Sequence, residues 1–332
     1  MMWPTLTVRL VAVTAMAVAV IAINDATGAQ REARGYPSKP IRMVVPFTAG
    51  SSTDIMARLL GPKMAEHWGQ QVVVDNRPSA GGTVAGTIVA TAAADGHTLL
   101  VASAVFAGGA ALYDKLPYDP IKDFRGITQL ASTPFVLIVP ASLGVKTVGD
   151  LIALARQKPG QLSFSSAGIG SGTHYAGERF KLAAHLDTVH VPYKGTPEAI
   201  NDTIAGRVQY SMASIVPVVP LVKSGRILAL AVSTSQRART LPGVPTLIEA
   251  GLPDAECDGW YGVFVQSTTP HTIVTALSQE IARILELPDI SEKVVAQGGA
   301  VKHSTPEAFD RMVRDEIALR RKIFSASRTK AL

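Results

Sequence analysis

The chain has 332 residues and a net charge of +6, with 47% hydrophobic and 17% charged residues. That composition excludes a disordered chain, and the length predicts two domains of ordinary size. Because Cys257 is the single cysteine, no internal disulfide can form. An exported form of the chain must therefore be stabilised by a large hydrophobic core.

The N-terminus has the pattern of an export signal. Arg9 precedes an apolar run over residues 10–23, and small residues at 27–29 match what a signal peptidase reads. A membrane span needs about 20 apolar residues, so this run is short for one. We predict a signal peptide at 1–29, cleaved near Ala29, and a periplasmic protein. An uncleaved membrane anchor is the alternative.

Short apolar runs alternate with helical patterns along the rest of the chain. Thr147 with Asp150 predicts a capping box, and Thr-Pro pairs at Thr196, Thr269 and Thr305 predict helix starts. This alternation predicts an α/β fold with mostly parallel sheets. The predicted strands are Ile41–Val45, Val72–Val74, Thr98–Ala102, Phe135–Val139, Leu162–Ser165, Val189–Pro192, Val208–Met212, Ile227–Val232 and Gly262–Gln266.

Two extended segments are candidates for passing between lobes. Residues 126–140 are interrupted by Pro134 and are too long for one strand, and residues 256–266 form a second extended run. Two α/β lobes joined by two crossover strands would form a hinged cleft. The predicted lobes are 36–133 with 256–332, and 134–255.

Two turns rich in glycine, serine and threonine follow predicted strands and begin helices. The first, PFTAGSSTD, spans residues 46–54, and the second, SSAGIGSGTH, spans 165–174. A helix N-terminus leaves N–H groups unpaired and carries partial positive charge, so it suits an anion. Ligands of open α/β sheets bind beyond the carboxyl ends of strands, where both turns fall. The pair predicts a clamp for a small anion.

The donors of this clamp are backbone N–H groups and hydroxyls, with glycines that let the backbone approach a ligand. Asp54 would repel an anion, and we leave open whether it complements the helix dipole or meets a ligand ammonium or hydroxyl. His174 either lines the cleft or packs beside it. The predicted binding residues in the two turns are Gly50, Ser51, Ser52, Thr53, Asp54, Ser166, Gly168, Gly170, Ser171, Gly172, Thr173 and His174.

Motifs of other function classes are incomplete. Residues 168–172 read Gly-Ile-Gly-Ser-Gly, which misplaces the serine of a nucleophile elbow, and Thr173 replaces the third glycine of a dinucleotide fingerprint. The seven histidines lack zinc-ligand spacing. The basic residues near the C-terminus read as a solvated helix face, not a nucleic-acid surface. We predict a protein that is not an enzyme and has no cofactor, metal or nucleic-acid partner.

Longer strings resemble a known family, the Bug-type periplasmic solute-binding receptors of tripartite tricarboxylate transporters. The resemblance runs from Tyr36 to the last helix. It rests on YPSKPIRMVVPFTAGSSTD (36–54), VVVDNRPSAGG (72–82), LYDKLPYDPIKDF (112–124), HVPYKG (190–195) and LPGVPTLIEAGLP (241–253).

The resemblance implies a two-lobed Venus-flytrap receptor, similar to type II binding proteins, that hands a small carboxylate to integral-membrane transporter subunits. It implies that Phe47 and Ala49 join the first turn in holding the carboxylate. Ser51 and Ser52 stand where the family usually has glycines, and Ala213-Ser214 replace a common Asp-Asn pair. Ser214 keeps one polar contact at that position.

The chain is therefore predicted to be an exported, monomeric receptor for a small mono- or dicarboxylate. Two alternatives are a periplasmic sensor that signals to a membrane kinase, and an exported hydrolase using His174 and a loop serine.

Overall fold

The structure, a computed structural model, describes residues 35–79, 82–113 and 115–326. The predicted signal peptide lies outside these residues. Within them, no helix is both long enough and apolar enough to span a membrane.

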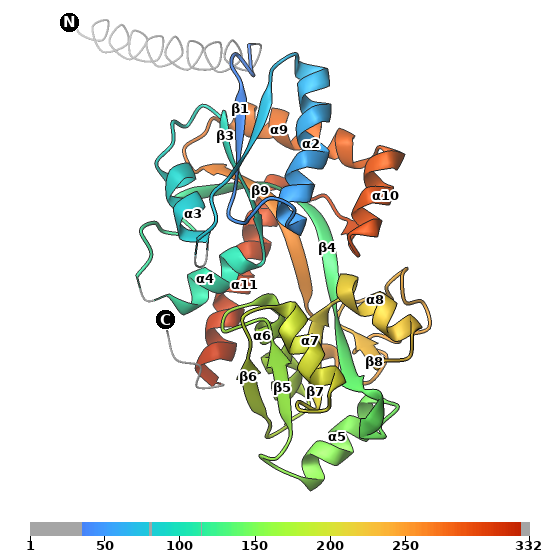
Figure 1. The fold of residues 1–332 in the computed structure, drawn as a ribbon. Coiled ribbons are helices and arrows are strands. Elements are labelled where there is room, and N and C mark those ends of the chain that lie inside the picture. Colours follow the sequence, from blue (N-terminus) through green and yellow to red (C-terminus); the bar gives the residue numbers. More distant parts are fainter. Residues whose placement is uncertain (1–34, 80–81, 114, 327–332) are drawn as a thin grey trace, which may run out of the picture.

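Strands and helices alternate over most of the chain, as the sequence predicts (Figure 1). The strands are β1 (Ile41–Val45), β2 (Val72–Asn76), β3 (Thr98–Ser103), β4 (Phe124–Pro140), β5 (Ser163–Ser166), β6 (Val189–Pro192), β7 (Tyr210–Ser214), β8 (Ile227–Val232), β9 (Asp258–Gln266) and β10 (Ala300–Val301). The helices are α2 (Ser52–Trp68), α3 (Thr83–Ala90), α4 (Val105–Leu112), α5 (Val148–Gln157), α6 (Gly172–Ala183), α7 (Thr196–Ile204), α8 (Ile215–Lys223), α9 (His271–Leu285), α10 (Pro288–Ala296) and α11 (Pro306–Ala326), with short 3-10 turns η2 (Ala141–Leu143) and η3 (Pro253–Ala255).

The strands pair in the order β2-β1-β3-β9-β4-β7-β5-β6, and β8 and β10 also pair with β4. The pairs β1–β2, β1–β3, β5–β6 and β5–β7 are parallel. Each antiparallel strand pair in the described part of the chain includes β4 or β9. The fold is thus two-lobed α/β, with each lobe built on parallel pairs and two antiparallel strands passing between them.

The 17-residue strand β4 corrects the expectation that residues 126–140 are too long for one strand. Its first part pairs with β9 up to Pro134, and its second part pairs with β7 and β8 from residue 135 onward. Pro134 has no N–H to give a ladder, and it stands where β4 changes partners. The register shifts along the strand let it twist through both lobes (Figure 1).

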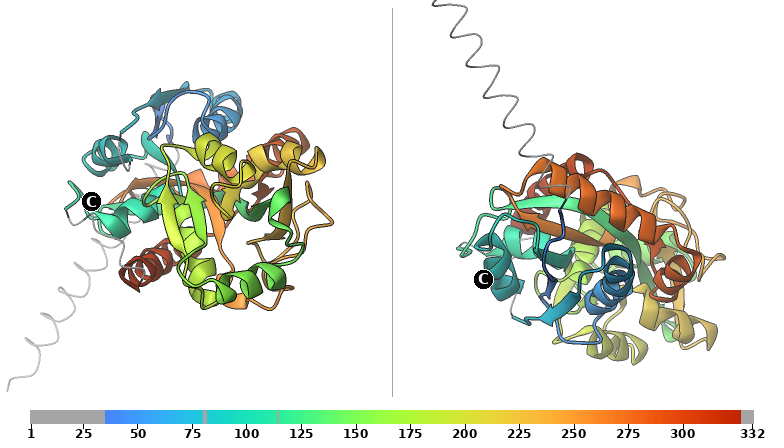
Figure 2. Two further views of the ribbon diagram at one scale, coloured as in Figure 1. Left: turned by 60° about the horizontal axis from the view of Figure 1, so that its bottom comes forward. Right: turned by 90° about the horizontal axis from the view of Figure 1, so that it is seen from above.

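Helices cover both faces of each half of the sheet. In the first half, α2 and α9 share one core cluster, and α3, α4 and α11 share another. Figure 2 shows α9 and α10 together on one side of the molecule and α3 and α4 on another. In the second half, α5 and α6 pack in one cluster and α7 and α8 in another. The parallel strands are therefore buried on both faces, as such strands usually are.

The end of α11 packs against the second half of the molecule. Ile323 and Phe324 belong to the core cluster that contains Phe164, Tyr175 and Tyr210. The C-terminal helix is therefore a third connection between the lobes, beside β4 and β9. The lobe boundaries given above stay a prediction, and the last turn of α11 belongs to neither lobe alone.

Local signals at helix starts have mixed outcomes. The capping box of Thr147 and Asp150 is confirmed, and Thr305 accepts a hydrogen bond from the Ala308 N–H at the start of α11. The start predicted at Thr196 is one residue late, because Gly195 is the N-cap of α7.

Candidate ligand-binding site

A cavity of about 260 Å³ lies between the two lobes, beside the strands that join them. Its walls include residues of β4 and β9 and the ends of strands on both sides. The lining residues are Phe47, Ser51, Ser52, Thr53, Ser103, Ala104, Val105, Thr133, Phe135, Ala167, Ser171, Gly172, Thr173, Thr196, Ser214, Gly259, Trp260 and Tyr261.

Five of the described helices begin at this cavity. The first residues or N-caps of α2, α4, α6, α7 and α8 all belong to the lining. In an α/β fold the carboxyl ends of the parallel strands lead into helix N-termini at one edge of the sheet. The partial positive ends of these helices therefore converge on the cavity from both lobes.

The two turns predicted from the sequence have the same cap geometry. Ser51 and Ser171 are the N-caps of α2 and α6. Each hydroxyl accepts a hydrogen bond from the backbone N–H three residues later, which is that of Asp54 in α2 and that of His174 in α6. That arrangement leaves the first two helical N–H groups of each helix without a partner among the described residues. These residues, Ser52 and Thr53 in α2 and Gly172 and Thr173 in α6, all line the cavity.

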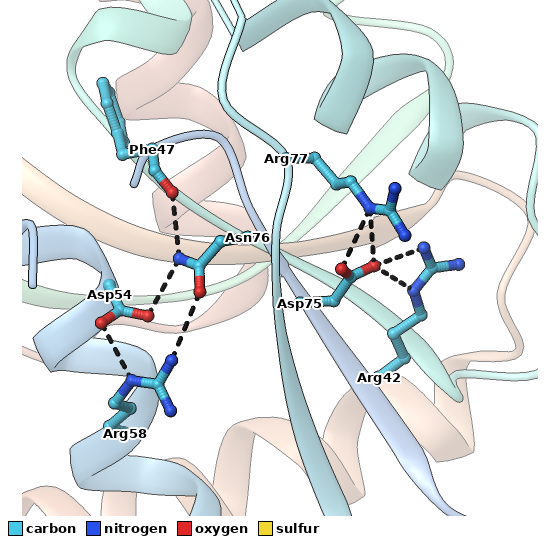
Figure 3. A network of polar contacts seen from close by, with 7 residues as sticks. All are labelled: Arg42, Phe47, Asp54, Arg58, Asp75, Asn76 and Arg77. Carbon is cyan, nitrogen blue, oxygen red and sulfur yellow. Dashed lines mark hydrogen bonds and ion pairs between the residues drawn. The ribbon is translucent and has the colours of Figure 1, made fainter. Parts of the chain in front are cut away.

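The first turn is held from behind by Asn76 at the end of β2 (Figure 3). The Asn76 Nδ2 atom donates to the Phe47 carbonyl and to Asp54 Oδ1, each at 2.9 Å. Asp54 Oδ2 accepts the Gly50 N–H at 2.8 Å and Arg58 Nε at 2.9 Å. The turn that begins α2 is therefore fixed at both ends before any ligand arrives.

Asp54, predicted as a ligand contact, is buried and is not among the residues that line the cavity. Burial raises the pKa of its carboxyl, but hydrogen bonds from Arg58, the Gly50 N–H and Asn76, with the Arg58 charge, lower it below the usual value overall. The carboxylate complements the start of α2 and braces the turn. Ala49 and Gly50 are exposed residues of this turn outside the cavity lining.

Three predicted residues of the second turn, Ser166, Gly168 and Gly170, form the bend of the turn and do not line the cavity. Ser166 is buried, and its hydroxyl lies 2.7 Å from His190 Nε2. Gly168 and Gly170 have left-handed φ values of 117° and 79°. A side chain at Gly170 would also approach Leu112 of α4 to 2.5 Å. These residues are outside the cavity lining because they form the bend beneath it.

His174 packs beside the cavity and is not among the residues that line it. Its ring is fully buried and stacks between His190 (centroids 4.0 Å apart) and Phe324 (5.1 Å), and its Nδ1 accepts the Gly170 N–H at 3.1 Å. Glu178 lies nearby, with one carboxylate oxygen 3.8 Å from His174 Nε2. The two imidazoles are nearly parallel, at 13°, so their in-plane lone pairs cannot converge on one metal ion.

Several lining residues were not predicted as ligand contacts. Trp260 and Tyr261 were noted only as part of an extended segment, and Thr133 and Phe135 flank Pro134 where β4 changes partners. Their position in the crossover strands could have indicated that these four residues line the cleft. No sequence feature indicates the start of α4, because its N-cap Ala104 has no capping side chain. The missed residues are Ser103, Ala104, Val105, Thr133, Phe135, Ala167, Thr196, Gly259, Trp260 and Tyr261.

The cavity lining is uncharged and partly aromatic. None of the described residues that line it is an Asp, Glu, Lys, Arg or His. Tyr261 has its pKa raised by burial, which outweighs an opposing hydrogen bond with the Ser52 side chain. Ser214 is in the lining, and Ala213 beside it is buried.

Residues 56–328 match the family described as "Tripartite tricarboxylate transporter family receptor". The chain belongs to this family.

Similar proteins and similar solved structures agree with this membership. Protein BugT of Bordetella pertussis is 34% identical over 304 residues, which are 90% of this chain and 93% of BugT. The structure of Rpa4515 from R. palustris with adipate is 35% identical, with a TM-score of 0.73 over 87% of this chain and 97% of that one. MatC from Rhodopseudomonas palustris with bound malate is 32% identical, with a TM-score of 0.71 over 87% and 99%.

The Bug-type resemblance and the two-lobed binding-protein fold are thereby confirmed. This receptor is a solute-binding component of a tripartite tricarboxylate transporter, and receptors of this family are exported proteins. The family match favours transport over the hydrolase and sensor alternatives.

Proposed function

We propose that this receptor binds a small carboxylate in the interlobe cavity, with the carboxylate between the starts of α2 and α6. The observation that carries the proposal is the pair of matching helix starts, each with two N–H groups in the cavity lining that have no partner among the described residues. Four N–H donors from two lobes can saturate the lone pairs of one carboxylate. Binding then draws the lobes together.

Helix dipoles, and no charged side chain, stabilise the negative charge of the ligand in this proposal. Each helix start favours a nearby anion by a few tenths to about 2 kcal/mol, and five helices begin at the cavity. An arrangement without a buried cation avoids the desolvation cost of a full counter-charge in the empty receptor. The hydroxyls of Ser52, Thr133 and Ser214 add donors and acceptors for a second polar group of the ligand.

The walls of the cavity select the body of the ligand. Phe47, Phe135, Trp260 and Tyr261 provide aromatic surface, which suits an aliphatic or aromatic body better than a densely hydroxylated one. Because Ala213 and Ser214 offer no carboxylate, we expect no site for an ammonium group. The related structures with adipate and malate make linear dicarboxylates the first candidates for this receptor.

We infer that the receptor closes by a hinge motion about β4 and β9, with lobes at 36–133 plus 256–332 and at 134–255. It is exported as a precursor whose signal peptide is removed near Ala29, acts as a monomer and has no enzymatic activity. The mass of the exported protein tests the cleavage site, and its elution volume in size-exclusion chromatography tests the monomer.

A substitution at Gly172 tests the site directly. A Cβ atom at this position would lie 2.7 Å from the Phe135 ring, so Gly172→Val must displace either the α6 start or a cavity wall. We expect the dissociation constant for the carboxylate, measured by isothermal titration, to rise at least about 30-fold. Ser171→Ala, which removes one hydroxyl and leaves the backbone donors in place, should have the smaller effect.

Gly149→Val is the matched control, because Gly149 also lies in the first turn of a helix and an added Cβ there would lie 3.7 Å from Thr147 Oγ1, an ordinary contact distance. Equal affinities of the Gly172→Val and wild-type proteins would refute the proposed site. Thermal-shift screening against dicarboxylates, aromatic acids and amino acids identifies the ligand first. Tight binding of an amino acid through its ammonium group would contradict the proposed ligand class.

A further inference from the structure

A second, larger cavity lies on the opposite face of the crossover strands. It has a volume of about 560 Å³, and its floor contains Ser132, Pro134 and Asp258. On β4 and β9 the facing pair Thr133–Gly259 lines the first cavity, and the next pair, Pro134–Asp258, lines the second. Because successive strand residues point to opposite faces, the two cavities are back to back across the same two strands.

The walls of this rear cavity come from different lobes. One wall is the loop 234–240 after β8, and the other runs from α10 through the Gly298-Gly299 turn to Lys302 after β10. The floor, made by β4 and β9, connects the two walls. Any molecule that touches both walls therefore bridges the lobes.

Three cationic side chains from both walls line the rear cavity. Arg239 has no hydrogen bond or ion pair with any residue in the described part of the chain. Arg237 is held by Glu249, with Nε 2.9 Å from Oε2. Lys302 on the opposite wall has only a loose contact with Asp258, 3.8 Å between Nζ and Oδ2. Arg239 and Lys302 are thus available to a ligand.

Asp258 is the carboxylate among the described residues of this lining, and its negative charge at neutral pH opposes the binding of an anion. Burial, opposed by Lys302 and reinforced by Glu256 and Glu316, raises the pKa of Asp258 to about 6. Its Oδ1 atom is buried without a hydrogen-bond partner. Below pH 6 the neutral carboxyl can donate a hydrogen bond, and Lys302 loses its acidic neighbour.

We propose that the rear cavity binds a small multivalent oxyanion between Arg239 and Lys302, and that its occupation opposes closure of the receptor over its carboxylate. The second half of the proposal rests on the proposed function. Bending about β4 and β9 that narrows the front cleft widens the rear one. An anion that holds the rear walls together therefore favours the open receptor, and by linkage the carboxylate weakens anion binding equally.

Sulfate is the probe, because its charge is constant between pH 5 and 8. Equilibrium dialysis with radiolabelled sulfate, at an ionic strength fixed with sodium chloride, measures saturable binding. We expect one site per chain, with tighter binding at pH 5.5 than at pH 7.5. Asp258→Asn should bring the pH 7.5 affinity to the pH 5.5 value. The double variant Arg239→Gln with Lys302→Gln should lose about tenfold in affinity.

The double variant Lys115→Gln with Lys158→Gln is the control, because it makes the same change in net charge at exposed positions elsewhere. Gly172→Val should retain sulfate binding, which separates this site from the front cavity. Repeating the dialysis of Gly172→Val with citrate in place of sulfate shows whether the rear cavity prefers an organic or an inorganic anion. Absence of saturable sulfate binding, equal losses in the two double variants, or loss in Gly172→Val would overturn the rear site.

The coupling is measured separately, by titrating the carboxylate with and without saturating sulfate. We expect a weaker carboxylate affinity with sulfate in the wild type and no change in the Arg239→Gln, Lys302→Gln receptor. Unchanged affinity in the wild type would overturn the coupling and leave the rear site standing. Failure to bind any carboxylate would instead count against the proposed function.

Discussion

Asn76 is the side chain that fixes the first turn of the site without touching the cavity. It joins the Phe47 carbonyl to Asp54, and both contacts disappear in Asn76→Ala (Figure 3). Loss of these half-buried hydrogen bonds should lower the free energy of unfolding by about 1–3 kcal/mol. Because the loosened turn must be ordered again when ligand binds, we expect about tenfold weaker carboxylate binding in isothermal titration.

Arg77→Ala is the neighbouring control. Arg77 follows Asn76 in the chain, but its guanidinium is exposed and pairs with Asp75, away from the turn (Figure 3). We expect a change in stability below about 0.5 kcal/mol and an unchanged ligand affinity. Equal losses of affinity in the two variants would show that Asn76 has no special role in holding the turn.

At the scale of elements, α11 has a role that its place in the sequence does not indicate. Its last turn places Phe324 in the core of the other lobe, where the ring stacks on His174 of α6. Phe324→Ala should therefore lower the free energy of unfolding by about 3–5 kcal/mol. Leu319→Ala in the same helix, where the side chain is 36% exposed, should cost less than about 1 kcal/mol. Urea denaturation measures both, and similar costs would contradict the docking of this turn.

The elements themselves were largely predictable, because their signals are local. The apolar runs of β1, β3 and β8, the capping box at Thr147 and the Ser-rich starts of α2 and α6 all depend on neighbouring residues. The single strand β4 was missed because the change of partner at Pro134 is a tertiary event.

The sequence predicted a residue of the candidate site only where that residue also belongs to a local motif, such as a helix start. Ser52, Thr53, Gly172 and Thr173 are at helix starts that the sequence announces, and they line the cavity. Asp54 and His174 belong to the same strings, yet burial and packing direct them behind the turns. Conversely, Phe135 and Trp260 enter the site through the crossing of two strands distant in sequence, which no local pattern encodes.

At the scale of the whole molecule, two cavities share one pair of strands. The front cavity gathers five helix starts around an uncharged, aromatic lining, and the rear cavity places cations on two separate walls. The same bending that brings the front donors together separates the rear cations. The fold can therefore couple the capture of a carboxylate to a second anion without any contact between the two ligands.

A crystal structure of the receptor with its bound carboxylate tests the central claim most directly. We predict that one ligand carboxylate accepts hydrogen bonds from backbone N–H groups of Ser52 or Thr53 in one lobe and of Gly172 or Thr173 in the other, with no charged side chain in contact. A carboxylate paired with an arginine or lysine, or bound away from the two helix starts, would contradict it.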